Sequence, residues 1–473
     1  MTQVVSIFER IGLGGGGKIK AVYARMNAIA EIPEFQPVLF NLHHSVTQKL
    51  NFKTLQAEGI ISDRAHNITL PEACYDAVKP SHDHGGIVFP AYDASKTKNN
   101  RVQYYQNGLR VMVDKLETTP LGTLTKRRMP WGDGERVYHI LNDSVHQLVQ
   151  RNPDGSVDTT DFVNSVPICW TKSQDGNFVS GKNFLSGKVY RLRRMFMKSL
   201  FELVSWEGRA VCFDGITSAY LAEVAGRQRT LILHADHRGP AGKTVPRSQK
   251  LIESFQGEAI ITSTHAHKTK METDLTPAAP VYVVPHYYEP ETAKPHARKD
   301  LVTVSRLDLA GKPIHETIAA FCLIMHEFPE VNYVVYGSGD GQEILTKLID
   351  ELNCGSRVKL AGYTGNVDRV FQSAIASVYP TLTEGFGLSM LEALFNGCPV
   401  ISYDVDYGPR EMIDRGKNGE LVQPGNVSDI AEAMRRVLTH PEQYQAATRQ
   451  GLEHYTREAF VANYYQIIKR LTA

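Results

Sequence analysis

The stretch TEGFGLSMLEALFNGCPVISYD, residues 383–404, decides how this chain is interpreted. It predicts a turn, a helix of about two turns from Leu388 to Asn396, and a buried strand. A glycine directly after the helix, with a proline close behind, ends it. Two carboxylates, Glu384 and Glu392, bracket the Gly-Phe-Gly turn, which packing alone does not require.

This turn and helix suit either an anionic ligand or packing alone. The first turn of a helix leaves backbone N–H groups unpaired, and the helix dipole favours negative charge there. Gly385 and Gly387 allow the backbone to approach a ligand closely. In the alternative, Ser389 and Glu392 spell the capping box S-x-x-E, which satisfies the helix start without any ligand. These residues alone leave both interpretations open.

Composition and length describe a multidomain protein of near-neutral charge. The chain has 473 residues, 52 basic and 51 acidic, so we expect two or three domains and no nucleic-acid partner. The beginning lacks the pattern of a secretory signal, and no apolar run reaches the length of a membrane span. The cysteines form no CxxC pair, which favours buried free thiols in a reducing cytosol: Cys74, Cys169, Cys212, Cys322, Cys354 and Cys398. We therefore predict a cytoplasmic protein.

Strand and helix patterns divide the chain into five segments. Residues 1–69 start a βαβ unit, with VVSIF as a strand, GLGGGGK as a loop and FQPVLFNLH as the next strand. Residues 70–190 carry turn signals such as NPDGS and SQDGN between short β-like runs, which indicates a β-rich insertion. Residues 191–295 complete the first domain, 296–455 form a second α/β domain, and 456–473 form a C-terminal crossover helix. This α/β pattern predicts two Rossmann-like domains that face a cleft.

The pattern E-x7-E in EGFGLSMLE resembles the donor-site signature of retaining glycosyltransferases with the GT-B fold. The surrounding EALFNGCPVISYDVDYGPREMIDRGKNGELVQPGN is similar to the large family-4 group. Within it, YDVDYGPREMI resembles the bacterial enzymes that transfer glucose or N-acetylglucosamine to the poly(glycerol-phosphate) or poly(ribitol-phosphate) of wall teichoic acid. The resemblance covers residues 301–426 well and is weaker over the N-terminal domain.

The resemblance implies roles for the donor-site residues. Glu384 would contact the donor sugar and Glu392 the ribose hydroxyls, since a carboxylate accepts two hydroxyl hydrogen bonds. The family places an arginine and a lysine after the first strand of this domain, where they stabilise the departing diphosphate. Arg306 and Lys312 match them, although the family spacing is five residues and here it is six.

Further donor contacts follow from the same resemblance. His237 is the preferred histidine near the donor sugar, with His234 three residues before it as the alternative. The remaining predicted contacts are backbone and turn positions: Gly16, Gly17, Gly362, Tyr363, Gly385, Phe386, Gly387, Leu388 and Ser389. A zinc site at the two histidines, with Asp236 and His286 as further ligands, is an alternative, but it offers no compact third ligand. We therefore predict no cofactor and no metal.

The acceptor is predicted from resemblance and charge together. LTKRRMPWG (124–132) and KVYRLRRMFMK (188–198) are basic clusters that suit a polyanionic polyol-phosphate polymer, or are solvated faces. The family also implies a homo-oligomer formed through the insertion. A lipid-linked acceptor would add peripheral association with the inner face of the membrane.

Three alternatives stay open beside this interpretation. A protein acceptor fits similar enzymes that modify serine or threonine of surface adhesins, although these usually differ where this chain has DYGPREMI. A non-catalytic paralogue would be expected to lack one of the motif carboxylates, and Glu384 and Glu392 are both present. A phosphorylase would carry a pyridoxal-bound lysine, to which nothing in the sequence points. The residues do not distinguish UDP-glucose from UDP-N-acetylglucosamine, nor do they define the acceptor linkage.

Overall fold

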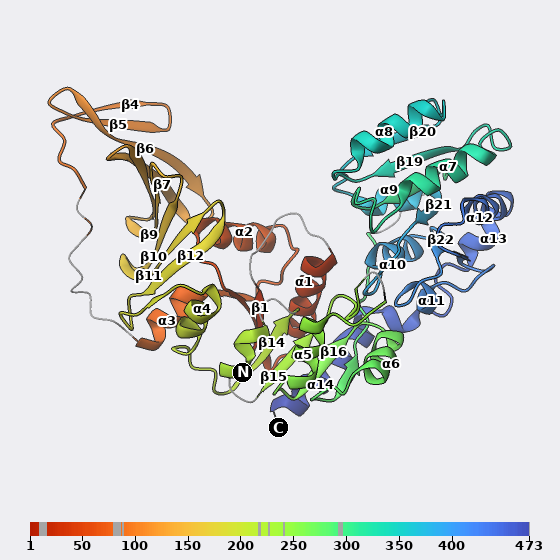
Figure 1. Cartoon of the computed structure of the whole chain (residues 1–473), viewed down its shortest axis with the longest axis horizontal. Helices are drawn as coiled ribbons and strands as arrows, with labels where there is room; N and C mark the ends of the chain where they lie inside the picture. Colours follow the sequence, from red (N-terminus) through yellow and green to blue (C-terminus); the bar gives the residue numbers. More distant parts are fainter. Residues whose placement is uncertain are drawn as a thin grey trace. The chain divides into compact units, whose positions relative to one another are not determined.

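The computed structural model describes residues 1–8, 17–78, 87, 89–215, 219–225, 228–239, 242–291 and 297–472 (Figure 1). Its contacts divide the chain into two compact units. Unit 1 comprises Met1–Leu231, Gln256–Glu258 and Ile468–Ala473, and unit 2 comprises Ile232–Phe255 and Ala259–Ile467.

Unit 1 contains a parallel sheet in which β14, β1, β2 and β3 are neighbours in that order. The run VVSIF is buried on both faces, as expected for a strand covered by helices. The strands are β1 (Thr2–Phe8), β2 (Phe35–Asn41), β3 (His66–Thr69) and β14 (Arg209–Asp214). The helices of this unit are α1 (Gly17–Ala30), α2 (Val46–Ala57), α3 (Leu70–Val78), α4 (Arg193–Phe201) and the 3-10 helix η1 (Ala219–Val224).

The same unit holds an antiparallel sheet of ten strands that follow one another in chain order (orange to yellow in Figure 1). Tight turns explain this meander, because Asn107-Gly108 and Asp175-Gly176 have both residues at positive φ, as type I′ hairpins need. The β-rich insertion is thereby confirmed, although residues 70–78 of the predicted segment form α3 and the sheet begins at Ala94. Its strands are β4 (Ala94–Lys98), β5 (Arg101–Gln106), β6 (Leu109–Thr119), β7 (Gly122–Trp131), β8 (Gly134–Leu141), β9 (Ser144–Arg151), β10 (Val157–Val163), β11 (Val166–Gln174), β12 (Asn177–Asn183) and β13 (Val189–Tyr190).

Unit 2 contains a six-stranded parallel sheet with the order β20-β19-β18-β21-β22-β23. Its strands are β18 (Asp300–Val304), β19 (Asn332–Tyr336), β20 (Val358–Gly362), β21 (Ala374–Tyr379), β22 (Val400–Tyr403) and β23 (Gly419–Val422). Its helices are α7 (Ile314–Ile324), α8 (Gln342–Glu351), α9 (Val367–Ser373), α10 (Leu388–Phe395), α11 (Pro409–Met412), α12 (Val427–Thr439) and α13 (Pro441–Ala446), followed by the 3-10 helix η2 (Glu453–Tyr455). Apolar side chains of these helices bury both faces of the sheet.

Three further strands lie at or after the point where the chain enters unit 2. The first, β15 (Arg229–Ile232), ends at Ile232, the first residue of unit 2. The other two, β16 (Ala259–Thr262) and β17 (Val281–Val283), pair in parallel. Helices α5 (Pro246–Ser254) and α6 (His265–Asp274) belong to the same part of the chain. The predicted C-terminal amphipathic helix is α14 (Arg457–Thr472).

The strand order brings together the loops that carry the predicted donor-site residues. β18 and β22 are both neighbours of β21, so the loops after these three strands leave the same edge of the sheet. The sequence places Lys312 after β18, Glu384 after β21 and Asp404 after β22. Parallel topology, and not sequence proximity, makes Lys312 and Glu384 neighbours.

Candidate functional site

Lys312 and Glu384 form an ion pair at this edge of the six-stranded sheet. The Lys312 Nζ also donates to the Thr381 hydroxyl at 2.9 Å and to the Tyr379 hydroxyl at 3.1 Å, and it lies 4.4 Å from the centroid of the Tyr379 ring. Thr381 in turn donates to Glu384 Oε1 at 3.0 Å. Both charged side chains are 13% exposed, so the cation and the carboxylate are held in place yet reachable.

Tyr379 links the two carboxylates of the E-x7-E motif. Burial raises the pKa of its hydroxyl well above the usual value, and the nearby negative charges of Glu384 and then Glu392 raise it further. Ser389 opposes this effect through a hydrogen bond. Glu392 itself is buried within α10. The motif carboxylates therefore share one polar neighbourhood.

Arg306 is exposed just beyond the end of β18. Among the described residues, its guanidinium has no hydrogen-bond or ion-pair partner. A free cation on the same loop as Lys312 is available for an anionic ligand.

The Gly-Phe-Gly turn is fitted tightly against other backbone of unit 2. A Cβ atom on Gly385 would lie 2.2 Å from the His234 carbonyl oxygen, and the Ser263 hydroxyl donates to the Gly385 carbonyl at 2.9 Å. Phe386 is buried, with its ring edge against His286. The turn is thus packed into a defined conformation.

The capping-box interpretation of Ser389 and Glu392 is wrong. The N-cap of α10 is Gly387, whose φ of 93° is left-handed, and no side chain caps the helix. Ser389 lies inside the first turn, and Leu388 is the first helical residue. A glycine at the N-cap leaves the amides at the helix start open to an anion, which favours the alternative interpretation.

The two histidines after β15 differ in their surroundings. His234 is partly exposed, and its ring is parallel to that of His286 with centroids 6.1 Å apart. His237 is 1% exposed, and its Nε2 lies 3.3 Å from Asp274 Oδ2. Burial lowers the pKa of His237.

The remaining predicted contacts fall at strand or helix ends. Gly362 ends β20 with a φ of 73°, and Tyr363 after it is 75% exposed. Gly17 is the first residue of α1, and Gly16 lies outside the described residues. The predicted thiols are confirmed as free, and five of the six are buried.

Several polar residues of the site were not predicted from the sequence. Thr381 and Tyr379 hold Lys312, and their position at and just after the end of a strand, in SVYPTLTE, is the signal that could have identified them. Glu411 accepts from the backbone N–H groups of His265 and Ala266, at 3.1 and 2.8 Å, and so caps the start of α6. No local pattern connects residues 145 positions apart.

Residues 286–454 match the family of group 1 glycosyl transferases. Together with the parallel sheets and the antiparallel insertion, this match defines a chain with the GT-B fold that carries a group 1 glycosyl transferase domain. A structure of TarM from S. aureus in complex with fondaparinux, α-GlcNAc-glycerol and UDP has a TM-score of 0.77, covers 99% of this chain and 100% of its own, and is 16% identical. That likeness concerns the fold.

The particular relatives are enzymes that glycosylate polymers or peptides. A poly(glycerol-phosphate) α-glucosyltransferase of Bacillus subtilis is 35% identical over 36% of this chain and 26% of its own length. A poly(ribitol-phosphate) α-N-acetylglucosaminyltransferase of Staphylococcus aureus is 25% identical over 60% and 59%. The GtfA subunit of a peptide N-acetylglucosaminyltransferase of Streptococcus parasanguinis is 25% identical over 62% and 58%. The chain thus spans between about a quarter and three fifths of the length of these relatives.

None of the described helices has the length and apolar character that crossing a bilayer requires.

Proposed function

We propose that this protein is a retaining glycosyltransferase that moves glucose or N-acetylglucosamine from a UDP-sugar to a polyol-phosphate polymer. The observation that carries the proposal is the ion pair of Lys312 with Glu384, held by Thr381 and Tyr379 at the carboxyl edge of a parallel sheet. It combines a cation for a diphosphate with a carboxylate for sugar hydroxyls, beside a helix start without a side-chain cap.

The proposed chemistry is electrostatic stabilisation of the leaving group. As the bond from the anomeric carbon to the diphosphate oxygen breaks, negative charge grows on that oxygen. Lys312, Arg306 and the amides at the start of α10 would stabilise this charge, so no protein acid is needed. The departing oxygen would take the proton of the acceptor hydroxyl, which attacks from the same face and retains the configuration. No metal takes part in this scheme.

Glu384 and Glu392 would position the donor. Glu384 would accept hydrogen bonds from the sugar hydroxyls and Glu392 from the ribose hydroxyls. The exposed ring of Tyr363, after β20, is suited to stacking on the base. Of the two histidines we assign the sugar contact to His234, because it keeps exposed surface whereas His237 is buried beside Asp274.

The acceptor assignment is supported by the relatives that act on poly(glycerol-phosphate) and poly(ribitol-phosphate). On one face of the insertion, Arg101, Lys115 and Lys126 are opposite one another on β5, β6 and β7. Glu117 pairs with Lys115 at 2.6 Å and with Lys126 at 3.2 Å, so the row keeps an excess of positive charge that would suit a repeating phosphate polymer. The oligomeric state, the cytoplasmic location and peripheral membrane association stay predictions.

A peptide acceptor is the second candidate, because the relative from Streptococcus parasanguinis matches a similar share of this chain. Purified protein would be given UDP-glucose or UDP-N-acetylglucosamine, alone and then with poly(glycerol phosphate), poly(ribitol phosphate) or a serine-rich peptide. The measured quantity is UDP release, with Glu384→Gln as the control. Polymer-dependent release that is lost in Glu384→Gln is the expected result. Release with the peptide alone would replace the acceptor, and tight UDP binding without any release would contradict the transferase proposal.

A further inference from the structure

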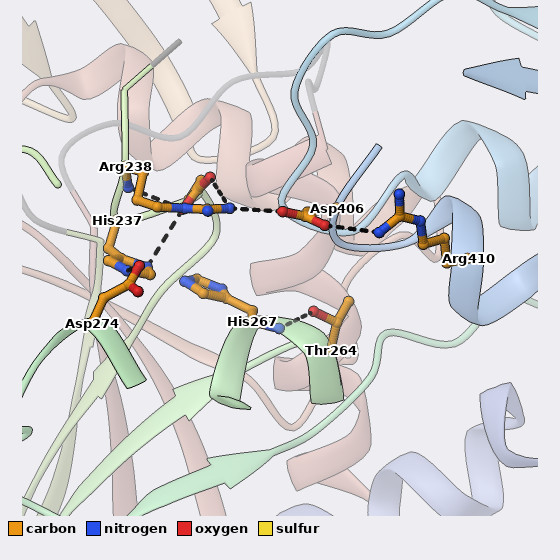
Figure 2. Close-up of polar contacts among 8 residues, drawn as sticks. His237, Arg238, Thr264, His267, Asp274, Asp406 and Arg410 are labelled. Atoms are coloured by element: carbon orange, nitrogen blue, oxygen red, sulfur yellow. Dashed lines mark hydrogen bonds and ion pairs between the residues drawn. The ribbon is translucent and has the colours of Figure 1, made fainter. Parts of the chain in front are cut away.

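Two buried imidazoles, His237 and His267, lie close together in unit 2 (Figure 2). The rings of His237 and His267 are parallel to within 4°, and their centroids are 5.5 Å apart. His237 follows β15, whereas His267 lies in the first turn of α6, where its backbone N–H donates to the N-cap Thr264. Their exposed fractions are 1% and 0%.

Polar atoms around these rings lack partners. Among the described residues, neither ring nitrogen of the buried His267 has a hydrogen-bond partner. The Tyr407 ring lies 4.7 Å from that of His267. Buried polar groups without partners are rare in native proteins and point to a bound water or ion.

His237 lies between two carboxylates in a way that one neutral ring cannot satisfy. Its Nε2 is 3.3 Å from Asp274 Oδ2, and its Nδ1 is 3.4 Å from Asp236 Oδ1. A neutral imidazole carries a single N–H, so if Asp274 receives it, the Nδ1 lone pair faces a carboxylate oxygen. That repulsion disappears when a cation lies between the two atoms.

The charges of the surrounding network leave a negative excess. Arg238 bridges Asp236 at 3.3 Å and Asp406 at 3.0 Å, and Arg410 contacts Asp406 at 3.1 Å (Figure 2). With Asp274 on His237 and Asp404 on Arg410, four carboxylates face two guanidiniums. Asp406 thus shares the charge of Arg238 with Asp236, and the excess of carboxylates favours a cation.

We propose that Asp236, His237 and His267 bind a divalent transition-metal ion of the type of Zn²⁺. One donor atom from each residue lies within 4.8 Å of the others. Zinc bonds of about 2.0–2.2 Å place ligand atoms roughly 3.3–3.6 Å apart, so small side-chain movements complete the site. A water would supply the fourth position.

Asp274 completes the arrangement as an outer carboxylate. His267 and Asp274 are two helical turns apart on α6 and therefore lie on the same face of it. A carboxylate that accepts from the second nitrogen of a metal-bound histidine fixes its tautomer and orientation. The site differs from the zinc alternative considered for the sequence, because the third ligand is His267 and not His286. The ion would tie α6 to the loop after β15, so its role is structural and separate from the transfer chemistry.

The test measures metal binding directly and needs no activity. The full chain is loaded with Zn²⁺, freed of excess metal by gel filtration and analysed by mass spectrometry for zinc per chain. Titration with Co²⁺ follows, with the visible absorption of a tetrahedral complex as the signal. We expect about one ion per chain and a tetrahedral spectrum. His267→Gln and His237→Gln should lose both, whereas His265→Gln, an exposed position on the same helix, should keep them.

Asp274→Asn provides an intermediate case and should weaken binding by about 10–100-fold, as losses of outer partners do. Far-UV circular dichroism checks that each variant folds. If the His267 variant does not fold, the Co²⁺ spectrum of the unmodified chain and the Asp274→Asn affinity decide. Absence of zinc and of a tetrahedral Co²⁺ spectrum in the unmodified chain would show that the orphan groups hold water only. Equal loss in His265→Gln would place the ion elsewhere, and either result overturns the proposal.

Discussion

Replacing Lys312 by methionine tests the proposed stabilisation of the leaving group. The substitution keeps the length of the side chain and removes its charge, which contacts Glu384, Thr381 and Tyr379. If Lys312 stabilises charge that develops only as the diphosphate departs, kcat and kcat/KM should fall together. The loss should be about 10²–10³-fold, the usual effect of removing one preorganised charge-stabilising group.

The same substitution should also destabilise the fold, by an amount that the structure bounds. Breaking a fully buried ion pair costs about 3–5 kcal/mol because the remaining charge is uncompensated. Here Glu384 keeps its hydrogen bond from Thr381 and is 13% exposed. We therefore expect a loss of roughly 1–3 kcal/mol in the free energy of unfolding.

Two variants separate catalysis from stability. The double variant Lys312→Met/Glu384→Gln removes the unpaired charge, so it should recover most of the stability but none of the activity. Lys347→Met changes an exposed lysine of α8 and should alter neither. UDP release under saturating donor gives kcat, and urea unfolding gives stability. If Lys312→Met keeps kcat within about threefold of the unmodified protein while its folding is intact, the cation does not act on the leaving group and the reasoning fails.

Three further predictions concern stability. Gly408→Ala would place Cβ 1.8 Å from the Phe386 carbonyl oxygen at a φ of 99°, whereas Gly416→Ala, at a φ of 79°, meets nothing within 4 Å. Urea unfolding should show a loss of about 1–2 kcal/mol in the free energy of unfolding for Gly416→Ala and a clearly larger loss for Gly408→Ala. Equal losses would refute the clash. Glu411→Gln removes the charged cap of α6, so thermal melts should report a loss of about 0.5–2 kcal/mol, and an unchanged melting temperature would contradict the capping role. Burial lowers the pKa of His44 to about 4, below its usual value of 6.5, so the unfolded chain binds more protons between these values and stability should fall as the pH drops from 6.5 toward 4. At pH 5 the loss from this residue should be roughly 2 kcal/mol relative to pH 7, and His44→Gln should flatten the measured pH dependence; an unchanged pH profile would show that its ring is accessible to protons.

The sequence by itself determined the local elements of the donor region. The alternation of apolar runs with turn residues predicted the turn, α10 and β22, because strand and helix periods are properties of short segments. Paired turn residues such as Asn107-Gly108 likewise determine the hairpins of the insertion, since positive φ angles are a local requirement. The capping box failed because Ser389 has the residue type of a cap, while the left-handed Gly387 takes that position.

Only the tertiary structure decided which side chains meet. Lys312 and Glu384 are 72 positions apart in the sequence and pair because β18 and β21 are neighbours in the sheet. His237 and His267 belong to different segments, and the packing of α6 places them ring to ring. Such contacts depend on strand order and helix packing, which arise from the whole core and leave no periodic signal in either segment. The residue types of the site can therefore be predicted from the sequence, whereas their partners, burial and charge balance depend on the fold.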